Sequence, residues 1–579
     1  MHSRNPYRVP PDFEAIARAY PPLAKHIQGR TIDFHDDAAQ RCLTQALLKC
    51  DFNLEIELPP DRLCPPVPNR YYPFPKKPLS IASLTPTARL NYVLWIQDIV
   101  AALQDIVPFV WEGFSGDRVA TTRGLDIGTG ASAIYPLLAC AREPSWRFIA
   151  TEIDDLSYGY AQANMRSNGL SDRIQVVKVD ANISHPDRNS NPSPKSEAGG
   201  LKFGFDRLFS SSSGGAGVGD ASSEGKLGGV EIQFTMCNPP FYSSAEDVAQ
   251  SEAGKALGAF GACTGAPVEM ITPGGEAQFV GAMVRESVPV RTMRGEKVGA
   301  EIIVVASEGV DKGTKRRRIE DGHTLSPDTT SGSTMYLVEP DRTQIKTVRW
   351  YTSMLGKMSS VVEVVGVFKE LEITNYAITE FVQGQTRRWA VGWSVGPWRL
   401  GDDIARIANP NPTLQRLLPP RNTLRFVINN DSGAGKPKTR LQGVLADVED
   451  LIVHVQASDA EVHDEADADD LMAEHTQVKF TVSARRDTWS RGARRKRKRG
   501  DAAGGGSVLH EVGGEPAFIC DVLIRLDAGR AEAKNEVELE VRWLYGWERA
   551  LLESFASHVA KKLDDRSLDV IAKWLRRQI

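Results

Sequence analysis

An alternation of strand-like and helix-like segments in the first half of the chain constrains its fold more than any other feature. Apolar runs at 123–127, 146–153 and 231–237 are typical of buried strands. Helical patterns at 131–142 and 154–168 follow the first two of these runs. Strands that alternate with helices form βαβ units, in which the strands are parallel. The sequence therefore predicts an α/β domain with a Rossmann-like parallel sheet.

The first predicted strand runs into a glycine turn, in which Asp126 is followed by Gly128 and Gly130. Such glycines allow a tight turn and let backbone amides approach a ligand. The third glycine of the usual dinucleotide motif is missing, and Asp126 would repel a pyrophosphate. Glu152 ends the second strand, where an acid can accept hydrogen bonds from both ribose hydroxyls, although capping of the next helix is an alternative role. Together these residues favour S-adenosylmethionine over NAD as the cofactor.

The most specific motif in the chain is Asn238-Pro239-Pro240-Phe241, which directly follows the third predicted strand. The exocyclic amine of a base is a poor nucleophile because its lone pair is delocalised into the ring. The side-chain oxygen of Asn238 and the backbone oxygen of Pro239 can each accept one amine hydrogen and so direct the lone pair toward a methyl donor. Phe241 offers a face on which a flipped base can stack. The motif predicts methylation of a planar amine but leaves adenine, guanine N2 and protein glutamine open as substrates.

The length of 579 residues predicts more than one folded unit. Residues 1–400 are expected to form the methyltransferase-type domain with an N-terminal extension, and 401–420 a linker. Three stretches of this domain read as insertions from their composition, namely 70–88, 185–229 and 296–343. Residues 421–579 are expected to form an α+β domain split by a basic, Gly-rich loop at 490–515. Its predicted elements are strands at 424–428, 478–484, 516–526 and 537–546 and helices at 439–455 and 548–563.

The net charge of −4 conceals blocks of opposite charge. Residues 459–474 hold eight acidic side chains, whereas 485–499 hold nine Lys or Arg. The basic block suits RNA phosphates, with a solvated loop as the alternative, and the acidic block could compete with RNA for it. A further basic run at 315–318 is either a nuclear import signal or a solvated segment. Seven cysteines form no C-x-x-C pair, and neither a signal peptide nor a membrane span is evident, so we expect no metal, no membrane and a location in the nucleus or also the cytoplasm.

Several motifs resemble the methyltransferase-like protein 16 family. They include H-S-R-N-P-Y at the start of the chain, R-L-N-Y-V-L-W-I-Q-D at 89–98, D-I-G-T-G-A-S at 126–132, A-T-E-I-D-D at 150–155, C-N-P-P-F at 237–241, R-W-Y-T-S-M-L-G-K at 349–357 and T-E-F-V-Q-G-Q-T-R-R-W-A at 379–390. The resemblance covers roughly residues 1–400 outside the insertions. It implies a class I S-adenosylmethionine-dependent methyltransferase fold and methylation of adenosine N6 in U6 small nuclear RNA. Hairpin-containing messenger RNA is a further candidate substrate.

The resemblance also implies roles for individual residues. Arg89, Gly128 and Glu152 should contact the cofactor together with Asp126 and Gly130, while Asn238–Phe241 should hold the adenine. Arg388 matches an arginine of the family's RNA-contacting groove, but Gln385 stands where the family has a second arginine, which would weaken one contact. The family carries an autoinhibitory lysine loop after the third β-strand, whereas this sequence reads D-A-N-I-S-H after V-V-K-V at 176–179 and then a long Ser- and Gly-rich insertion, so we do not carry that regulation over.

The C-terminal third resembles, less closely, the vertebrate-conserved-region domain of the same family, a second RNA-binding module. The fragments that carry this match are K-F-T-V-S-A-R-R-D-T-W-S at 479–490 and V-E-L-E-V-R-W-L-Y-G at 537–546. The candidate RNA-binding residues of the whole chain are Arg4, Arg8, Lys357, Arg388, Arg485, Arg486, Arg494, Arg495, Lys496, Arg497, Lys498 and Arg499.

Two rival functions stay open at this point. A protein-glutamine N5-methyltransferase would account for Asn238–Phe241 but not for the basic tract or the C-terminal domain. A non-catalytic RNA-binding scaffold would not need the intact motif and glycine turn. No dimerisation stripe is evident, so a monomer is expected. We also hypothesise that residues 70–88 are a retained intron, because they lack any pattern and interrupt the resemblance; a spliced transcript that encodes them would refute this.

Overall fold

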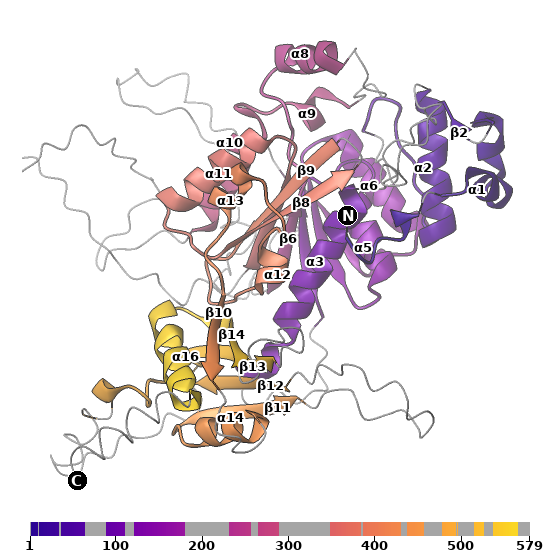
Figure 1. The fold of residues 1–579 in the computed structure, drawn as a ribbon. Coiled ribbons are helices and arrows are strands. Elements are labelled where there is room, and N and C mark those ends of the chain that lie inside the picture. The colour runs from indigo at the N-terminus through magenta and orange to yellow at the C-terminus, as the bar shows by residue number, and fades with distance from the viewer. Residues whose placement is uncertain are drawn as a thin grey trace, which may run out of the picture. The chain divides into compact units, whose positions relative to one another are not determined.

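The strands expected in the first half of the chain belong to a seven-stranded sheet in the computed structural model (Figure 1). The structure describes residues 2–9, 11–29, 31–33, 36–63, 88–110, 121–179, 231–255, 265–288, 348–383, 386–429, 437–456, 478–493, 495, 515–525 and 536–564. All elements considered below belong to one unit, which is formed by residues 1–287 and 346–579.

The seven strands lie in the order β5-β4-β3-β6-β7-β9-β8. Their bounds are β3 Arg123–Ile127, β4 Arg147–Glu152, β5 Ile174–Lys178, β6 Ile232–Cys237, β7 Val348–Leu355, β8 Tyr376–Gln383 and β9 Thr386–Trp393. The first five in this order are parallel, whereas β9 is antiparallel to both of its neighbours. The parallel, Rossmann-like sheet predicted from the alternating pattern is confirmed.

Helices cover both faces of this sheet (Figure 1). Phe148 and Phe234 pack into the core formed with α2 (Asp37–Phe52), α3 (Ala88–Gln104), α5 (Ile134–Arg142) and α6 (Asp155–Ser167). Leu125 and Ile149 pack into the other core, with α10 (Gly275–Ser287) and α11 (Met358–Glu370). Strands that are buried on both faces have apolar side chains on both, which explains why these strands read as continuous apolar runs. In the N-terminal extension, α1 (Phe13–Ala19) precedes α2.

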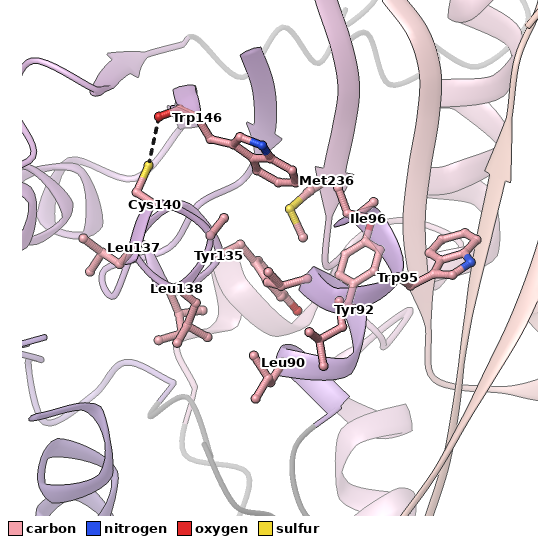
Figure 2. Packing of buried hydrophobic residues seen from close by; sticks show 14 of the residues in the cluster. Leu90, Tyr92, Trp95, Ile96, Tyr135, Leu137, Leu138, Cys140, Trp146 and Met236 are labelled. Carbon is pink, nitrogen blue, oxygen red and sulfur yellow. Dashed lines mark hydrogen bonds between the residues drawn. The ribbon is translucent and has the colours of Figure 1, made fainter. Parts of the chain in front are cut away.

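Helix α3 lies in the interior and is apolar around most of its surface. Figure 2 shows its residues Tyr92 and Ile96 close to Tyr135 of α5 and Met236 of β6, while Trp95 points away from these two residues. The rings of Tyr92 and Tyr135 meet edge to face with centroids 5.5 Å apart. The stretch Arg89–Val110, which continues into α4 (Val107–Val110), is long and apolar enough to cross a membrane by composition alone, but 61% of its most apolar window is buried inside the protein. Its apolar character is that of a core helix.

The helix after the glycine turn begins at Ile134, three residues later than the helical pattern indicates. Ala133, which caps it, has a left-handed backbone with φ of 46°, and its amide donates to the carbonyl of Gly130 over 3.2 Å. The turn therefore extends to Ala133. The helix predicted at 154–168 is confirmed as α6, with the side chain of Asp154 accepting the amide of Ser157 over 2.8 Å as its N-cap.

The segment 401–420, expected as a linker, contains two short helices, α12 (Asp402–Ala405) and α13 (Pro412–Leu417). Leu414 and Leu417 are buried in the same core as α10 and α11. The hydroxyl of Tyr376 on β8 donates to the carbonyl of Leu417 over 2.9 Å. This part of the segment is thus packed against the large sheet.

The C-terminal part contains a five-stranded antiparallel sheet in the order β10-β14-β13-β12-β11. Its strands are β10 Thr423–Asn429, β11 Leu451–Gln456, β12 Val478–Ala484, β13 Phe518–Arg525 and β14 Glu536–Gly546, and it packs with α14 (Pro437–Ala446) and α16 (Arg549–Leu563). The prediction of one helix over 439–455 is wrong in its second half. Asp450 has a left-handed backbone with φ of 59°, which ends helical geometry, and residues 451–456 pair with β12.

Candidate active site

The carboxyl ends of β3 and β6 define the candidate site. These strands are neighbours in the sheet, with Ile127 opposite Cys237. The helix that follows β3 packs on one face of the sheet and helix α10, which follows β6, packs on the other. Such a reversal opens a crevice at the strand ends, where open α/β sheets bind their ligands. The two motifs found in the sequence therefore meet at one place.

The glycine turn after β3 has the conformation that its composition predicts. Gly128 and Gly130 have φ of 69° and 67°, which a side chain would strain. A Cβ placed on Gly128 would meet no atom within 4 Å, so the space beside this backbone is open. The amide of Thr129 donates to the carbonyl of Thr151 on β4 over 2.9 Å and fixes the turn against the neighbouring strand. The turn thus offers a backbone surface that a ligand can approach closely.

Asp126 is a buried carboxylate without a hydrogen-bond partner. Its side chain is fully buried, and neither oxygen bonds to any residue that the structure describes. Burial raises the pKa of Asp126 to about 7, with a further increase from Glu152, while the nearby Thr129 hydroxyl and Arg89 act in the opposite direction. A buried carboxylate in this state is costly unless a ligand supplies a donor or a positive charge.

Glu152 holds the turn from the end of β4. Its Oε2 accepts the amide of Gly130 over 2.7 Å, while Oε1 accepts the amides of Ile153 and Asp154 over 2.9 and 3.0 Å. The carboxylate is 6% exposed, so its orientation is fixed before any ligand binds. Oε1 already accepts two amides, whereas Oε2 accepts one and keeps a lone-pair direction for one of the predicted bonds from the ribose hydroxyls.

Glu269 is a third acid at the turn that sequence reasoning missed. It lies on the short helix α9 (Pro267–Met270), and its Oε2 accepts the amides of Leu63 and Ala266 over 2.9 and 3.2 Å. Its Oε1 lies 3.7 Å from the point at which a side chain on Gly130 would begin. Burial raises the pKa of Glu269, and nearby Glu152 raises it further. A glutamate at the third position of a helix is a capping signal, and nothing in the sequence connects it to the turn.

Arg89 brings a positive charge to this acidic site from the first turn of α3. Its guanidinium lies 5.9 Å from the centroid of the Tyr135 ring and lowers the pKa of Asp126. S-adenosylmethionine has an ammonium and a sulfonium for the acids and a carboxylate for the arginine. The residues present fit this cofactor: Asp126, Glu152, Arg89 and the glycine turn would hold it, and when bound it supplies an electrophilic methyl group.

The Asn238–Phe241 loop lies beside the turn. Asn238 is half-buried, and its side chain makes no hydrogen bond to any described residue. Pro239 is buried, and prolines fix the backbone and remove competing donors. Beyond Phe241, the amide of Tyr242 donates to the carbonyl of Met270 over 3.0 Å, and the carbonyl of Tyr242 accepts the amide of Thr272 over 2.9 Å. The loop is therefore fixed at both ends while the Asn238 amide stays available to a substrate.

Two of the predicted RNA-binding residues lie directly against this loop. The guanidinium of Arg388 on β9 lies 5.6 Å from the centroid of the Phe241 ring, and the ammonium of Lys357 lies 5.5 Å from that of Tyr242. Both contacts are within range of a cation–π interaction. The buried Glu276 accepts the amides of Gly356 and Lys357 over 2.6 and 2.8 Å and so fixes the turn that carries Lys357. Positive charge is thus placed next to the surface on which a base would stack.

Among the described residues, no hydrogen bond, ion pair or cation–π contact links the other predicted RNA-binding residues to this loop. Arg4 is paired with Asp98 over 2.5 Å and Arg8 is exposed. Arg486 is paired with Asp450, and Arg485 and Arg495 are exposed. Trp489, beside the basic tract, is a core residue packed against Phe518 and Phe555. Three parts of the prediction lie outside the described residues, namely Gln385, Arg494 and 496–499. Within the described residues, no cluster of three potential metal ligands occurs.

Comparison with known proteins agrees with this geometry. A family model described as RNA methyltransferase, Methyltransf_10, matches residues 1–74, 78–185, 227–293 and 334–396. The mouse RNA N(6)-adenosine-methyltransferase METTL16 is 29% identical over 436 residues, which make up 74% of this chain and 56% of the relative. The U6 small nuclear RNA (adenine-(43)-N(6))-methyltransferase of Schizosaccharomyces pombe is 25% identical over 94% of this chain and 98% of its own length. Among solved structures, the human METTL16 catalytic domain in complex with a MAT2A 3′UTR hairpin is 27% identical, covers 68% of this chain and 95% of that one, and has a TM-score of 0.41.

The chain spans just over half of the mouse relative and nearly all of the yeast relative. The resemblance and the class I methyltransferase fold expected from the motifs are confirmed. Two of the stretches that the family model leaves out, 186–226 and 294–333, overlap the expected insertions. Because the model matches more than half of the sequence and includes both the glycine turn and the Asn238–Phe241 loop, the chain belongs to the Methyltransf_10 family of RNA methyltransferases.

Proposed function

We propose that this protein transfers a methyl group from S-adenosylmethionine to N6 of an adenosine in a structured RNA, with U6 small nuclear RNA as the main substrate. One observation carries the proposal: Asn238 lies at the end of β6, next to β3, which carries the buried Asp126, and neither side chain bonds to another residue that the structure describes. The first group suits an amine that is to be methylated, and the second suits a cationic methyl donor.

The chain's own residues supply alignment in this reaction. The Asn238 side-chain oxygen and the Pro239 carbonyl oxygen each accept one hydrogen of the adenine amine. The nitrogen then becomes more tetrahedral, and its lone pair points toward the donor. No general base is needed for the attack, because the methylated ammonium readily loses its proton to water. Alignment and hydrogen-bond polarisation are large effects when both partners are held in place.

RNA as the substrate is supported by the charges beside the loop and by the relatives. Arg388 and Lys357 lie over Phe241 and Tyr242, where they would meet the phosphates that flank a flipped base. The two relatives compared above are named for N6 methylation of RNA adenosine, and the yeast one for U6 small nuclear RNA. The basic block at 485–499 in the C-terminal domain would add contacts to a folded RNA.

The protein's state in the cell forms part of the proposal. It acts as a monomer in the nucleus, where the basic run at 315–318 would serve as an import signal and U6 RNA is available. Replacement of this run by alanines in a fluorescently tagged chain should shift the protein to the cytoplasm. An unchanged nuclear signal would contradict this role for the run.

The catalytic proposal is tested by incubating the purified protein with labelled S-adenosylmethionine and a U6 transcript and then identifying the labelled nucleoside by mass spectrometry. Label in N6-methyladenosine of the RNA is expected. Label on protein glutamine would instead favour the glutamine methyltransferase. Tight RNA binding without any label would favour a non-catalytic scaffold.

A further inference from the structure

The pairing between β6 and β7 stops before either strand ends. Phe234 and Trp350 are the last residues in register, although β6 continues to Cys237 and β7 to Leu355. Beyond this pair, β6 still pairs with β3 and β7 with β9, but the buried backbone groups that β6 and β7 turn toward each other need other partners. Asn238 follows directly after this end of β6, which stays in register with β3 on its other side.

Two buried threonines bridge the gap between the strands. The amide of Thr352 donates to the hydroxyl of Thr235 over 2.9 Å. The hydroxyl of Thr352 donates to the carbonyl of Thr235 over 2.5 Å. Both side chains are fully buried, so water does not compete for these bonds. Side chains here replace the backbone ladder.

Tyr92 of α3 extends this network to the residue before Asn238. Its hydroxyl lies 2.6 Å from the hydroxyl of Thr352, and the amide of Cys237 donates to it over 3.3 Å. The direction of each bond follows from the chemistry. A carbonyl can only accept, so Thr352 donates to Thr235 and must accept from Tyr92, whose oxygen then accepts from Cys237. One continuous chain of donors thus runs from Cys237 through Tyr92 and Thr352 to Thr235.

From this chain we propose that Tyr92 is a positioning residue for methyl transfer, because its hydroxyl fixes the strand end that aims Asn238 at the substrate amine. Tyr92 lies one helical turn after Arg89, so the helix that reaches the cofactor site also holds the catalytic loop. This proposal rests on the function proposed above only where methyl transfer is measured. The hydrogen-exchange test below does not depend on that function.

The alternative is that Tyr92 merely fills the core, in which its ring packs against Tyr135 (Figure 2). Tyr92→Phe separates the two roles because it keeps the ring and removes only the hydroxyl. A matched control is Tyr376→Phe, which removes a buried tyrosine hydroxyl that bonds to the carbonyl of Leu417, on the edge strand β8. Tyr92→Phe deletes two buried hydrogen bonds and Tyr376→Phe deletes one, but only the first change touches the loop.

The first readout is amide hydrogen exchange in the full chain without RNA. Loss of the Tyr92 hydroxyl leaves the Cys237 amide without its acceptor, so exchange at Cys237 should accelerate about tenfold or more in Tyr92→Phe. Tyr376→Phe should leave this amide as in the wild type. Equal exchange at Cys237 in all three proteins would overturn the proposal, whatever the substrate of the enzyme is.

The second readout is the single-turnover rate of methyl transfer with saturating cofactor and RNA. Tyr92→Phe should lower this rate about tenfold or more while the Kd for RNA and for the cofactor stay within about twofold, because a small misplacement of an aligned group is costly. Tyr376→Phe should keep the wild-type rate. A Tyr92→Phe protein that methylates at the wild-type rate would refute the inference, whereas a wild type that methylates no RNA would refute the proposed function instead.

A double-mutant cycle tests the chain itself. Thr352→Val should slow transfer about as much as Tyr92→Phe, and the double variant should be no slower than the worse single variant, because each change breaks the same chain. Thr352→Ser keeps the hydroxyl and should restore most of the rate. Rate losses that multiply in the double variant would show that Tyr92 and Thr352 act separately, and they would contradict a continuous hydrogen-bond chain between them.

Discussion

Replacement of Asp126 by asparagine tests the electrostatic character of the cofactor site. The folded protein holds the Asp126 proton with a pKa of about 7, because the carboxylate is buried without a partner, against an ordinary value of 3.8. Between these values the folded protein binds the proton and the unfolded chain does not. Unfolding then releases a proton, so the free energy of unfolding falls as the pH rises through this range. Asparagine has nearly the same shape and no such titration.

The size of the effect follows from the two pKa values. A difference of about three corresponds to about 4 kcal/mol in total, of which about 3 kcal/mol is lost between pH 5 and pH 8. The Asp126→Asn protein should therefore gain about 3 kcal/mol relative to the wild type over this interval. The measurement is urea unfolding of both proteins, without cofactor, at pH 5, 6, 7 and 8. Asp403→Asn, which changes an exposed carboxylate on α12, serves as the control and should follow the wild type.

Cofactor affinity should rise with pH, whereas the free energy of unfolding falls. A cationic ligand binds the ionised form of Asp126, so wild-type affinity for S-adenosylmethionine should rise up to about tenfold per pH unit below pH 7 and level off above it. Asp126→Asn should bind more weakly and lack this part of the pH dependence. Parallel unfolding and binding profiles for the wild type and Asp126→Asn would refute the assignment of Asp126 as a buried carboxylate awaiting a positive charge.

Two further predictions concern the turn and the RNA surface. Gly128→Ala should weaken cofactor binding and lower the free energy of unfolding by about 1 kcal/mol, because Gly128 has a left-handed backbone. Gly159→Ala in α6, where an added Cβ meets no atom within 4 Å, should leave stability unchanged or raise it. Calorimetry on both variants measures these changes in stability. Arg388→Ala should weaken RNA binding and reduce the slope of log Kd against log salt concentration by about one, with cofactor affinity unchanged. The control Arg285→Ala, which breaks a surface pair with Glu370, should leave this slope as it is. An unchanged slope in Arg388→Ala would contradict an RNA contact of Arg388.

The part of the site that sequence reasoning predicts lies on consecutive elements. Asp126, Gly128 and Glu152 sit at the ends of neighbouring parallel strands, and such strands present their carboxyl ends on one edge of the sheet. Asn238 joins them because β6 is the other neighbour of β3. The identity and order of these motifs are enough to bring them together. The chemistry of each residue type then indicates the ligand.

The features of the site and the fold that sequence reasoning missed depend on contacts between residues far apart in the sequence, which no local pattern contains. Glu269 reaches the turn from more than a hundred residues away in sequence, and Tyr92 bonds to Thr352, which lies 260 positions further along the chain. Residues 451–455 were predicted as helix because a short apolar run has no clear period. Pairing with β12 decides their conformation, and such pairing is a property of the folded chain. Arg4 reads as a free cation in sequence but is paired with Asp98.

The most direct test of the account compares Asn238→Ala and Asn238→Asp with the wild type in single-turnover methylation of the same RNA, with cofactor and RNA binding measured alongside. Loss of the side-chain acceptor in Asn238→Ala should lower the rate at least about a hundredfold while both Kd values stay near those of the wild type. Asn238→Asp still offers an oxygen to the amine and should keep a rate within about tenfold of the wild type. Full-rate methylation by Asn238→Ala would contradict the central claim that two oxygen acceptors at the end of β6 hold the amine that is methylated.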